Sequence, residues 1–97
     1  HKQIRGTLIV DAGAANALKT KGRSLLPVGV TDVRGSFDRG DIVAIETADG
    51  ERIATGLTNY GSDLAHQMFG NTTAQLTDRQ MLLEGDALVH RDNLALV

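Results

Sequence analysis

The chain has 97 residues, a net charge of −2 and an ordinary globular composition, with 41% hydrophobic and 23% charged residues. This length predicts a single domain, and no apolar run approaches the roughly 20 residues that a membrane-spanning helix needs. The lack of cysteine excludes disulfide scaffolds and thiolate metal sites and fits a cytoplasmic protein, and an aromatic content of 3% argues against base stacking as the main binding device.

The N-terminal part of the chain predicts a strand followed by a capped helix. Residues 7–10 form a short run that favours a strand. Asp11 stands where a helix N-cap belongs, and the Ala-, Leu- and Lys-rich residues 12–20 favour a helix. Gly22 is placed to end this helix in the left-handed conformation.

The next third of the chain predicts three strands. Residues 24–26 have the pattern of a short strand that Pro27 interrupts. Residues 30–37 follow as a twisted strand, and a turn is expected at 38–40. The nearly continuous apolar run within residues 41–47 indicates a strand that is buried on both faces.

A hairpin and two helices are expected after this run. Asp49-Gly50 is a strong hairpin signal, and residues 52–57 form the returning strand, in which Gly56 suggests a bulge or close packing. Ser62 is a plausible N-cap for a helix over residues 63–69 that Gly70 ends. Residues 73–83 are interpreted as a further helix.

The C-terminal residues predict two last strands, 87–90 and 94–97, on either side of a turn at 91–93. The whole set of elements predicts a mostly β fold with short helices. We expect a small barrel or half-barrel of about six strands with two or three helices at its rim.

Charge is distributed unevenly along the chain. Residues 1–39 carry seven cations and three anions, a net charge of +4, whereas residues 40–97 carry three cations and nine anions, a net charge of −6. A local basic cluster is formed by Lys19, Lys21 and Arg23. Such a cluster can bind phosphates, or it can simply place cations at the negative end of a helix dipole.

No combination of residues predicts catalysis within this chain. The run His90-Arg91-Asp92-Asn93-Leu94 resembles the start of a protein-kinase catalytic loop, but the rest of that signature is missing, so we interpret it as a strand–turn–strand. Asp38 and Asp41 flank a turn and are expected to serve it. The three histidines lack ligand spacing, so no metal site is expected, and no nucleophile stands with a base.

Three ordered motifs resemble a PUA domain, the module named after pseudouridine synthases and archaeosine transglycosylases: Asp11-Ala12-Gly13-Ala14, residues 24–30 and residues 35–41. Ser24-Leu25-Leu26-Pro27, residues 56–60 and residues 89–94 are further similar to the C-terminal PUA domain of bacterial glutamate 5-kinases. The resemblance covers residues 6–97, which we take as the domain. Residues 1–5 are then interpreted as a linker or tag remnant, because the first residue is His1 rather than Met.

The resemblance implies a PUA-like pseudo-barrel and a parent enzyme that phosphorylates the side-chain carboxylate of glutamate with ATP. In that family the ATP, Mg²⁺ and glutamate sites lie in an upstream amino-acid-kinase domain. No catalytic residue and no cofactor are therefore expected in this chain. The implied partners are the upstream kinase domain and further copies of the parent in a cytoplasmic homo-oligomer, and the implied role is regulatory or architectural.

The same resemblance keeps RNA binding open as the alternative. PUA domains of RNA-modifying enzymes bind structured RNA through the first helix, the loop after it and nearby strands. In this chain that surface would include the candidate phosphate-binding residues Lys19, Lys21, Gly22, Arg23 and Ser24. The glycine would let backbone N–H groups approach a phosphate, and the cations would add charge. Any RNA binding is expected to be weak, given the acidic C-terminal half.

Overall fold

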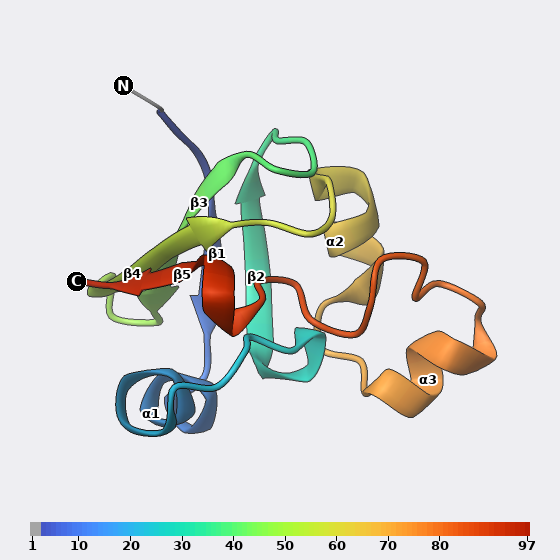
Figure 1. Ribbon diagram of the computed structural model, residues 1–97, viewed down its shortest axis with the longest axis horizontal. Coiled ribbons are helices and arrows are strands. Elements are labelled where there is room, and N and C mark those ends of the chain that lie inside the picture. The colour runs from blue at the N-terminus through green and yellow to red at the C-terminus, as the bar shows by residue number, and fades with distance from the viewer. Residues whose placement is uncertain (1–2) are drawn as a thin grey trace.

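A five-stranded sheet organises the structure (Figure 1), and the computed structural model describes residues 3–97. In chain order the elements are β1 (Ile4–Val10), α1 (Ala12–Lys21), the 3-10 turn η1 (Pro27–Gly29), β2 (Val30–Gly35), β3 (Ile42–Thr47), β4 (Arg52–Leu57), α2 (Ser62–Met68), α3 (Thr73–Asp78), the 3-10 turn η2 (Arg91–Asn93) and β5 (Leu94–Leu96). β1 begins at Ile4, so the sheet extends into the segment 1–5 that the sequence assigned to a linker. His1 and Lys2 lie outside the described residues.

The strands lie in the order β2-β1-β3-β4-β5. β1 is antiparallel to β2 and parallel to β3, and β4 is antiparallel to both β3 and β5. The predicted hairpin at Asp49-Gly50 joins β3 to β4 and is confirmed. The predicted combination of a small sheet and short helices is observed, but with five strands rather than about six. Because β2 and β5 remain edges, the sheet does not close into a barrel.

The predicted strands 24–26 and 87–90 are wrong, since each contributes only one bridge, Leu25 to Val89. The Leu25 N–H donates to the Val89 carbonyl at 2.9 Å, and the Leu88 N–H donates to the Leu25 carbonyl at 2.8 Å. Pro27 then starts η1, and its fixed φ and missing N–H stop the pairing after this bridge. The C-terminal segment therefore crosses beside β4 before it joins the sheet as β5.

Two helices differ from the sequence prediction at one end. The N-cap of α2 is Gly61 rather than Ser62, because the Ser62 hydroxyl hydrogen-bonds the backbone N–H and carbonyl of Phe37, both at 3.2 Å. The Ser62 side chain thus holds α2 against the loop after β2. The last helix, α3, ends at Asp78 rather than at residue 83, because Gln80 adopts a left-handed φ of 57°.

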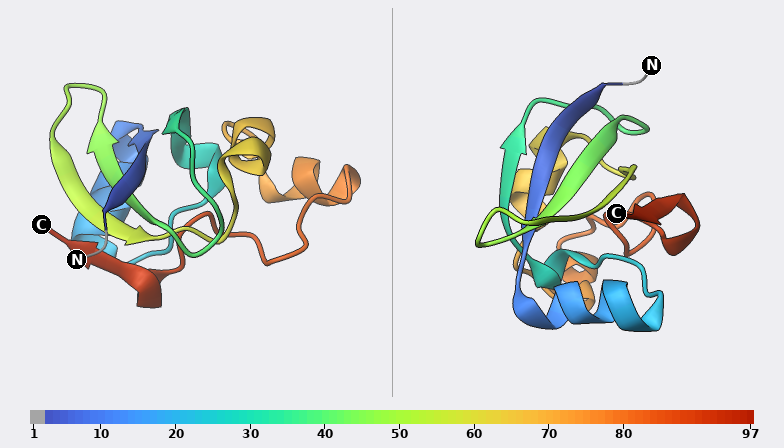
Figure 2. Two further views of the ribbon diagram at one scale, coloured as in Figure 1. Left: turned by 90° about the horizontal axis from the view of Figure 1, so that it is seen from above. Right: turned by 90° about the vertical axis from the view of Figure 1, so that its left-hand side faces the viewer.

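The core lies between the concave side of the sheet and the helices (Figure 2). Leu8 of β1 and Ile45 of β3 are completely buried, and Leu18 anchors α1 while Met68 anchors α2. Burying each of these side chains stabilises the fold by roughly 1.5–3 kcal/mol. None of the helices within residues 3–97 is long and apolar enough to cross a membrane.

Candidate phosphate-binding pocket beside helix α1

Helix α1 begins and ends where the sequence predicts. The Asp11 carboxylate accepts a hydrogen bond from the Ala14 N–H at 2.7 Å, which makes it the N-cap. At the other end Gly22 has φ 58° and ψ 35°, and its N–H donates to the Ala17 carbonyl. A left-handed residue here turns the chain sharply, because a side chain would strain this conformation and glycine has none. The residues that follow therefore fold back beside the helix.

A pocket of about 380 Å³ lies between α1 and the segment that runs from residue 23 to residue 29. Lys21, Arg23 and Ser24 line it, so the structure brings together three of the five predicted site residues. Gly22 shapes the turn and leaves open space around its Cα without lining the pocket. Lys21 and Arg23 are both exposed, and within residues 3–97 neither makes an ion pair. Their charges are thus available to an anion at this rim.

Lys19 does not belong to the pocket. It lies instead beside the β3–β4 hairpin, in hollows that it shares with residues such as Asp49 and Arg52. Residues two apart on a helix point about 200° from each other, so Lys19 and Lys21 cannot serve one small site. The sequence prediction grouped Lys19 with Lys21 because it did not take this angle into account.

Ser24 has a structural task at the pocket wall. Its hydroxyl oxygen accepts a hydrogen bond from the Arg91 N–H at 2.9 Å, across 67 positions of sequence. This bond holds η2 beside the end of α1. The Ser24 hydroxyl hydrogen remains able to donate to a ligand, because a hydroxyl can accept and donate at the same time.

Sequence reasoning missed the apolar part of the pocket. Leu26 and Val28 line it and are 37% and 47% exposed. The sequence signal was available, because apolar residues flank Pro27 in a segment too short to form a buried strand. The Asp11 carboxylate also lies at the rim. The arrangement can hold an anion at its cationic end while an apolar group contacts Leu26 and Val28.

Other polar residues flagged by the sequence have structural partners. Asp38 and Asp41 form the expected turn, in which the Asp38 N–H donates to the Asp41 carboxylate at 2.8 Å and the Asp41 N–H donates to the Asp38 carbonyl at 3.0 Å. His90 Nδ1 accepts from the Asp92 N–H at 3.1 Å and caps η2. His66 is exposed, as expected. Within residues 3–97, no three His, Asp or Glu side chains are grouped as metal ligands.

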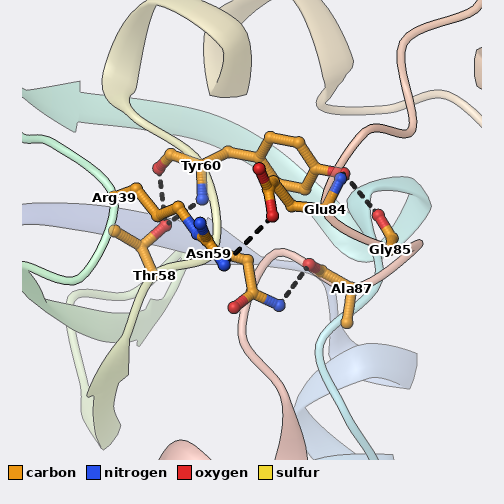
Figure 3. A network of polar contacts seen from close by, with 7 residues as sticks. All are labelled: Arg39, Thr58, Asn59, Tyr60, Glu84, Gly85 and Ala87. Atoms are coloured by element: carbon orange, nitrogen blue, oxygen red, sulfur yellow. Dashed lines mark hydrogen bonds and ion pairs between the residues drawn. The ribbon is translucent and has the colours of Figure 1, made fainter.

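A network around Tyr60 fixes the segment that leads into the C-terminal crossing (Figure 3). The buried Tyr60 hydroxyl accepts from the Glu84 N–H at 3.0 Å and donates to the Gly85 carbonyl. Asn59 Nδ2 donates to the Ala87 carbonyl at 3.1 Å, and Arg39 pairs with Glu84 at 3.0 Å. No local sequence signal reveals this network, because its partners are 24 to 45 positions apart.

The PUA domain model matches residues 6–78 of this chain. The chain belongs to the PUA domain family. Its curated relatives include the glutamate 5-kinase of Chromohalobacter salexigens, with 47% identity over 95 residues, and that of Cupriavidus pinatubonensis, with 42% identity over 97 residues. These alignments cover 98% and 100% of this chain but only 25% and 26% of the kinases. The chain therefore spans about a quarter of the length of these relatives, at their C-terminal end.

Solved structures share the fold. A PUA domain from Aeropyrum pernix K1, determined as a tartrate complex, aligns with a TM-score of 0.64 and 32% identity over 89% of this chain and 41% of its own. A chain of the archaeal box H/ACA sRNP complex aligns with a TM-score of 0.59 and 16% identity over 96% of this chain and 23% of its own. The second similarity is one of fold alone. The PUA-like fold expected from the sequence is confirmed.

Proposed function

We propose that this chain is the non-catalytic PUA domain of a glutamate 5-kinase and that its role is regulatory or architectural. The observation that carries the proposal is the 41–47% identity to glutamate 5-kinases along essentially the whole chain. The parent would use ATP and Mg²⁺ to convert L-glutamate to glutamyl 5-phosphate, the first step of proline biosynthesis, in the cytoplasm. Both cofactors would bind the preceding kinase domain.

The contacts of this domain support a non-catalytic role. Three side chains that could do acid–base chemistry hold local structure: Asp38 and Asp41 form a turn, and His90 caps η2. A residue that must keep its hydrogen-bond partner to maintain the backbone is poorly placed to exchange protons with a substrate. Asp38, Asp41 and His90 therefore stabilise the local backbone.

The experiment compares the 97-residue chain with the full-length protein in an assay of glutamate-dependent ATP consumption. We expect the full-length protein to turn over and the isolated chain, which carries a complete core of its own, to fold but show no activity. Turnover by the isolated chain that survives repeated purification would overturn its non-catalytic role. A full-length protein without glutamate-dependent turnover would overturn the parent assignment.

A second measurement addresses the regulatory or architectural role. The full-length protein is compared with a truncated form that lacks this domain. Kinetic assays measure the catalytic constants of both forms, and light scattering measures the mass of their assemblies. We expect a change in the kinetic constants or in the oligomeric state, because the domain would act through the kinase domain or the assembly. If neither changes, the proposed role is wrong even though the parent is right.

RNA binding at the pocket beside α1 is the second candidate function. The observation that favours it is that Lys21 and Arg23, which make no ion pair within residues 3–97, line a pocket that Leu26 and Val28 also line. Such a site offers charge to a phosphate and an apolar surface to a base or sugar. A titration with labelled tRNA at low and at physiological salt tests it.

A further inference from the structure

The face of the sheet that points away from the core carries an apolar row. Ile4, Ile42 and Leu57 are direct cross-strand partners on β1, β3 and β4. Direct partners project from the same face of a sheet. Their neighbours on β3, Val43 and Ile45, point to the opposite face and are completely buried in the core. We call Ile4, Ile42 and Leu57 the outer row.

The outer row is exposed to different degrees and does not join the core. Ile4 is 40% exposed, and Ile42 and Leu57 are half-buried. None of the three belongs to the core or to the partly buried residues packed against it. In the right-hand view of Figure 2, the strands lie in front of α2, and α1 runs below them. An apolar row on an open side of a sheet is a candidate contact surface.

Two ion pairs lie farther along the strands, while Arg5, which follows Ile4 in β1 at a register shift, is exposed. Arg34 pairs with Asp32 at 2.9 Å, and Arg52 lies 3.7 Å from Glu46. The hydrogen bond from Arg34 lowers the pKa of Asp32 below its ordinary value, so this pair stays ionised at neutral pH. A row of three apolar side chains suits the apolar centre of a protein surface better than a nucleic acid.

The position of the outer row along the chain indicates what covers it. Ile4 is the first residue of β1, and the related kinases continue for about three quarters of their length before this domain. The PUA match starts at residue 6, whereas the match to the Cupriavidus pinatubonensis kinase covers the whole chain and thus includes Ile4. Ile4 therefore lies near the start of the region that this chain shares with the kinases, close to the sequence that precedes this region in them. A short tether gives an effective concentration on the order of millimolar, so a small apolar contact is enough for docking.

We propose that the outer row is the surface on which the preceding domain of the full-length protein docks. This inference rests on the proposed function, in which this chain follows a kinase domain. The docked partner presents an apolar patch to Ile4, Ile42 and Leu57. Docking fixes the orientation of the PUA domain relative to the catalytic domain and gives the regulatory role a physical route.

Thiol labelling of the full-length protein tests the proposal with a matched control. Ile4→Cys and Leu64→Cys place thiols at positions of nearly equal exposure in this domain, 40% and 37%, but Leu64 lies on α2, away from the outer row. Labelling by a small maleimide is followed by mass spectrometry of the peptide that holds each new cysteine. We expect labelling at position 4 to be slower by about tenfold or more, the ratio that about 1.4 kcal/mol of docking free energy produces.

A second variant separates docking from mere proximity to the junction. Leu57→Lys places a charge in the outer row without altering position 4, and it should raise labelling of Ile4→Cys to the rate of the Leu64→Cys control. Equal rates at positions 4 and 64 before this change would overturn the proposal. So would slow labelling that Leu57→Lys does not relieve, because the tether alone then protects position 4.

The same labelling experiment distinguishes other causes of slow labelling at position 4. Protection that disappears on dilution would assign the outer row to a second copy of the chain and would overturn docking of the preceding domain. The readout does not use catalysis. If the full-length protein lacks glutamate-dependent turnover but protects position 4, the kinase assignment fails while the docking surface stands.

Discussion

At the scale of single residues, Asp11 is the clearest local determinant of the fold. Its carboxylate accepts the Ala14 N–H at the start of α1. We expect Asp11→Ala to lower the free energy of unfolding by about 1 kcal/mol, the usual effect of losing an N-cap. Asp11→Asn keeps an acceptor at the same position and serves as the control. Urea denaturation of the three proteins measures the effect, and a midpoint unchanged in Asp11→Ala would show that the cap contributes nothing.

The Tyr60 side chain connects segments that are far apart in the sequence. Its hydroxyl satisfies the Glu84 N–H and the Gly85 carbonyl, and Tyr60→Phe would leave both groups without that partner while keeping the ring. We expect a loss of about 0.5–1.5 kcal/mol in unfolding free energy, the net contribution of a typical hydrogen bond, because Glu84 and Gly85 are exposed and water can replace the lost hydroxyl. Thr20→Ala removes an exposed hydroxyl that bonds Asn16 and should cost nothing. Equal effects of the two changes in thermal unfolding would contradict this assignment.

At the scale of elements, the lack of a side chain at Gly56 explains how the C-terminal segment can pass close to β4. A Cβ on Gly56 would lie 2.5 Å from Val89 Cγ1 and 2.9 Å from the Asn93 carbonyl oxygen. We expect Gly56→Ala to push the 89–94 segment off β4 and to destabilise the fold by about 1–3 kcal/mol, as overpacking does. Hydrogen exchange should rise first in β5. The close packing expected at Gly56 from the sequence is confirmed.

Gly13 is the matched control for the Gly56 prediction. A Cβ at Gly13 would meet only the Asp11 carboxylate, at 3.4 Å, and Gly13 lies in α1. Gly13→Ala should therefore leave stability unchanged or raise it by up to about 1 kcal/mol through helix propensity. If calorimetry showed that Gly56→Ala and Gly13→Ala are destabilised equally, the loss of stability at position 56 would reflect glycine removal in general rather than contact with the crossing segment.

Elements whose signals are local were predictable from the sequence, and those that depend on distant partners were not. Asp11, Gly22 and Asp49-Gly50 act within a few residues, so the α1 boundaries and the hairpin follow from the sequence. Ser62 looked like a cap, but its hydroxyl serves Phe37, 25 positions away. The same limit applies to the site. Lys21, Arg23 and Ser24 were found together, whereas Lys19 was included because a linear cluster ignores the angle between helix positions.

At the scale of the whole molecule, the separation of charge along the chain governs any encounter with RNA. The chain carries a net charge of −2, with the anions concentrated after residue 39. A phosphate backbone that reaches the pocket beside α1 meets two free cations locally and repulsion elsewhere. The fold therefore restricts RNA to a small contact, whatever the RNA sequence.

This restriction gives a quantitative expectation for binding of labelled tRNA. Lys21 and Arg23 can neutralise about two phosphates, so the slope of log affinity against log salt should be about −1 to −2. At physiological salt the Kd should be about 10⁻⁴ M or weaker, the weak limit of non-specific binding. Two of the three aromatic residues, Phe37 and Tyr60, are buried, so base stacking adds little.

The decisive comparison uses Lys21→Glu and Lys19→Glu, which lower the net charge by the same amount, and we expect Lys21→Glu to weaken binding far more because only Lys21 lines the pocket. Lys21→Glu with Arg23→Glu should abolish the binding seen at low salt, because both cations of the pocket are lost. Lys19→Glu should have a much smaller effect, because Lys19 faces the β3–β4 hairpin and only the overall charge changes. Equal losses in the two single reversals, Lys21→Glu and Lys19→Glu, would mean that RNA responds to net charge rather than to the pocket. Tight binding that resists salt and survives the double change would place the RNA site elsewhere and would reverse the preference for a regulatory role.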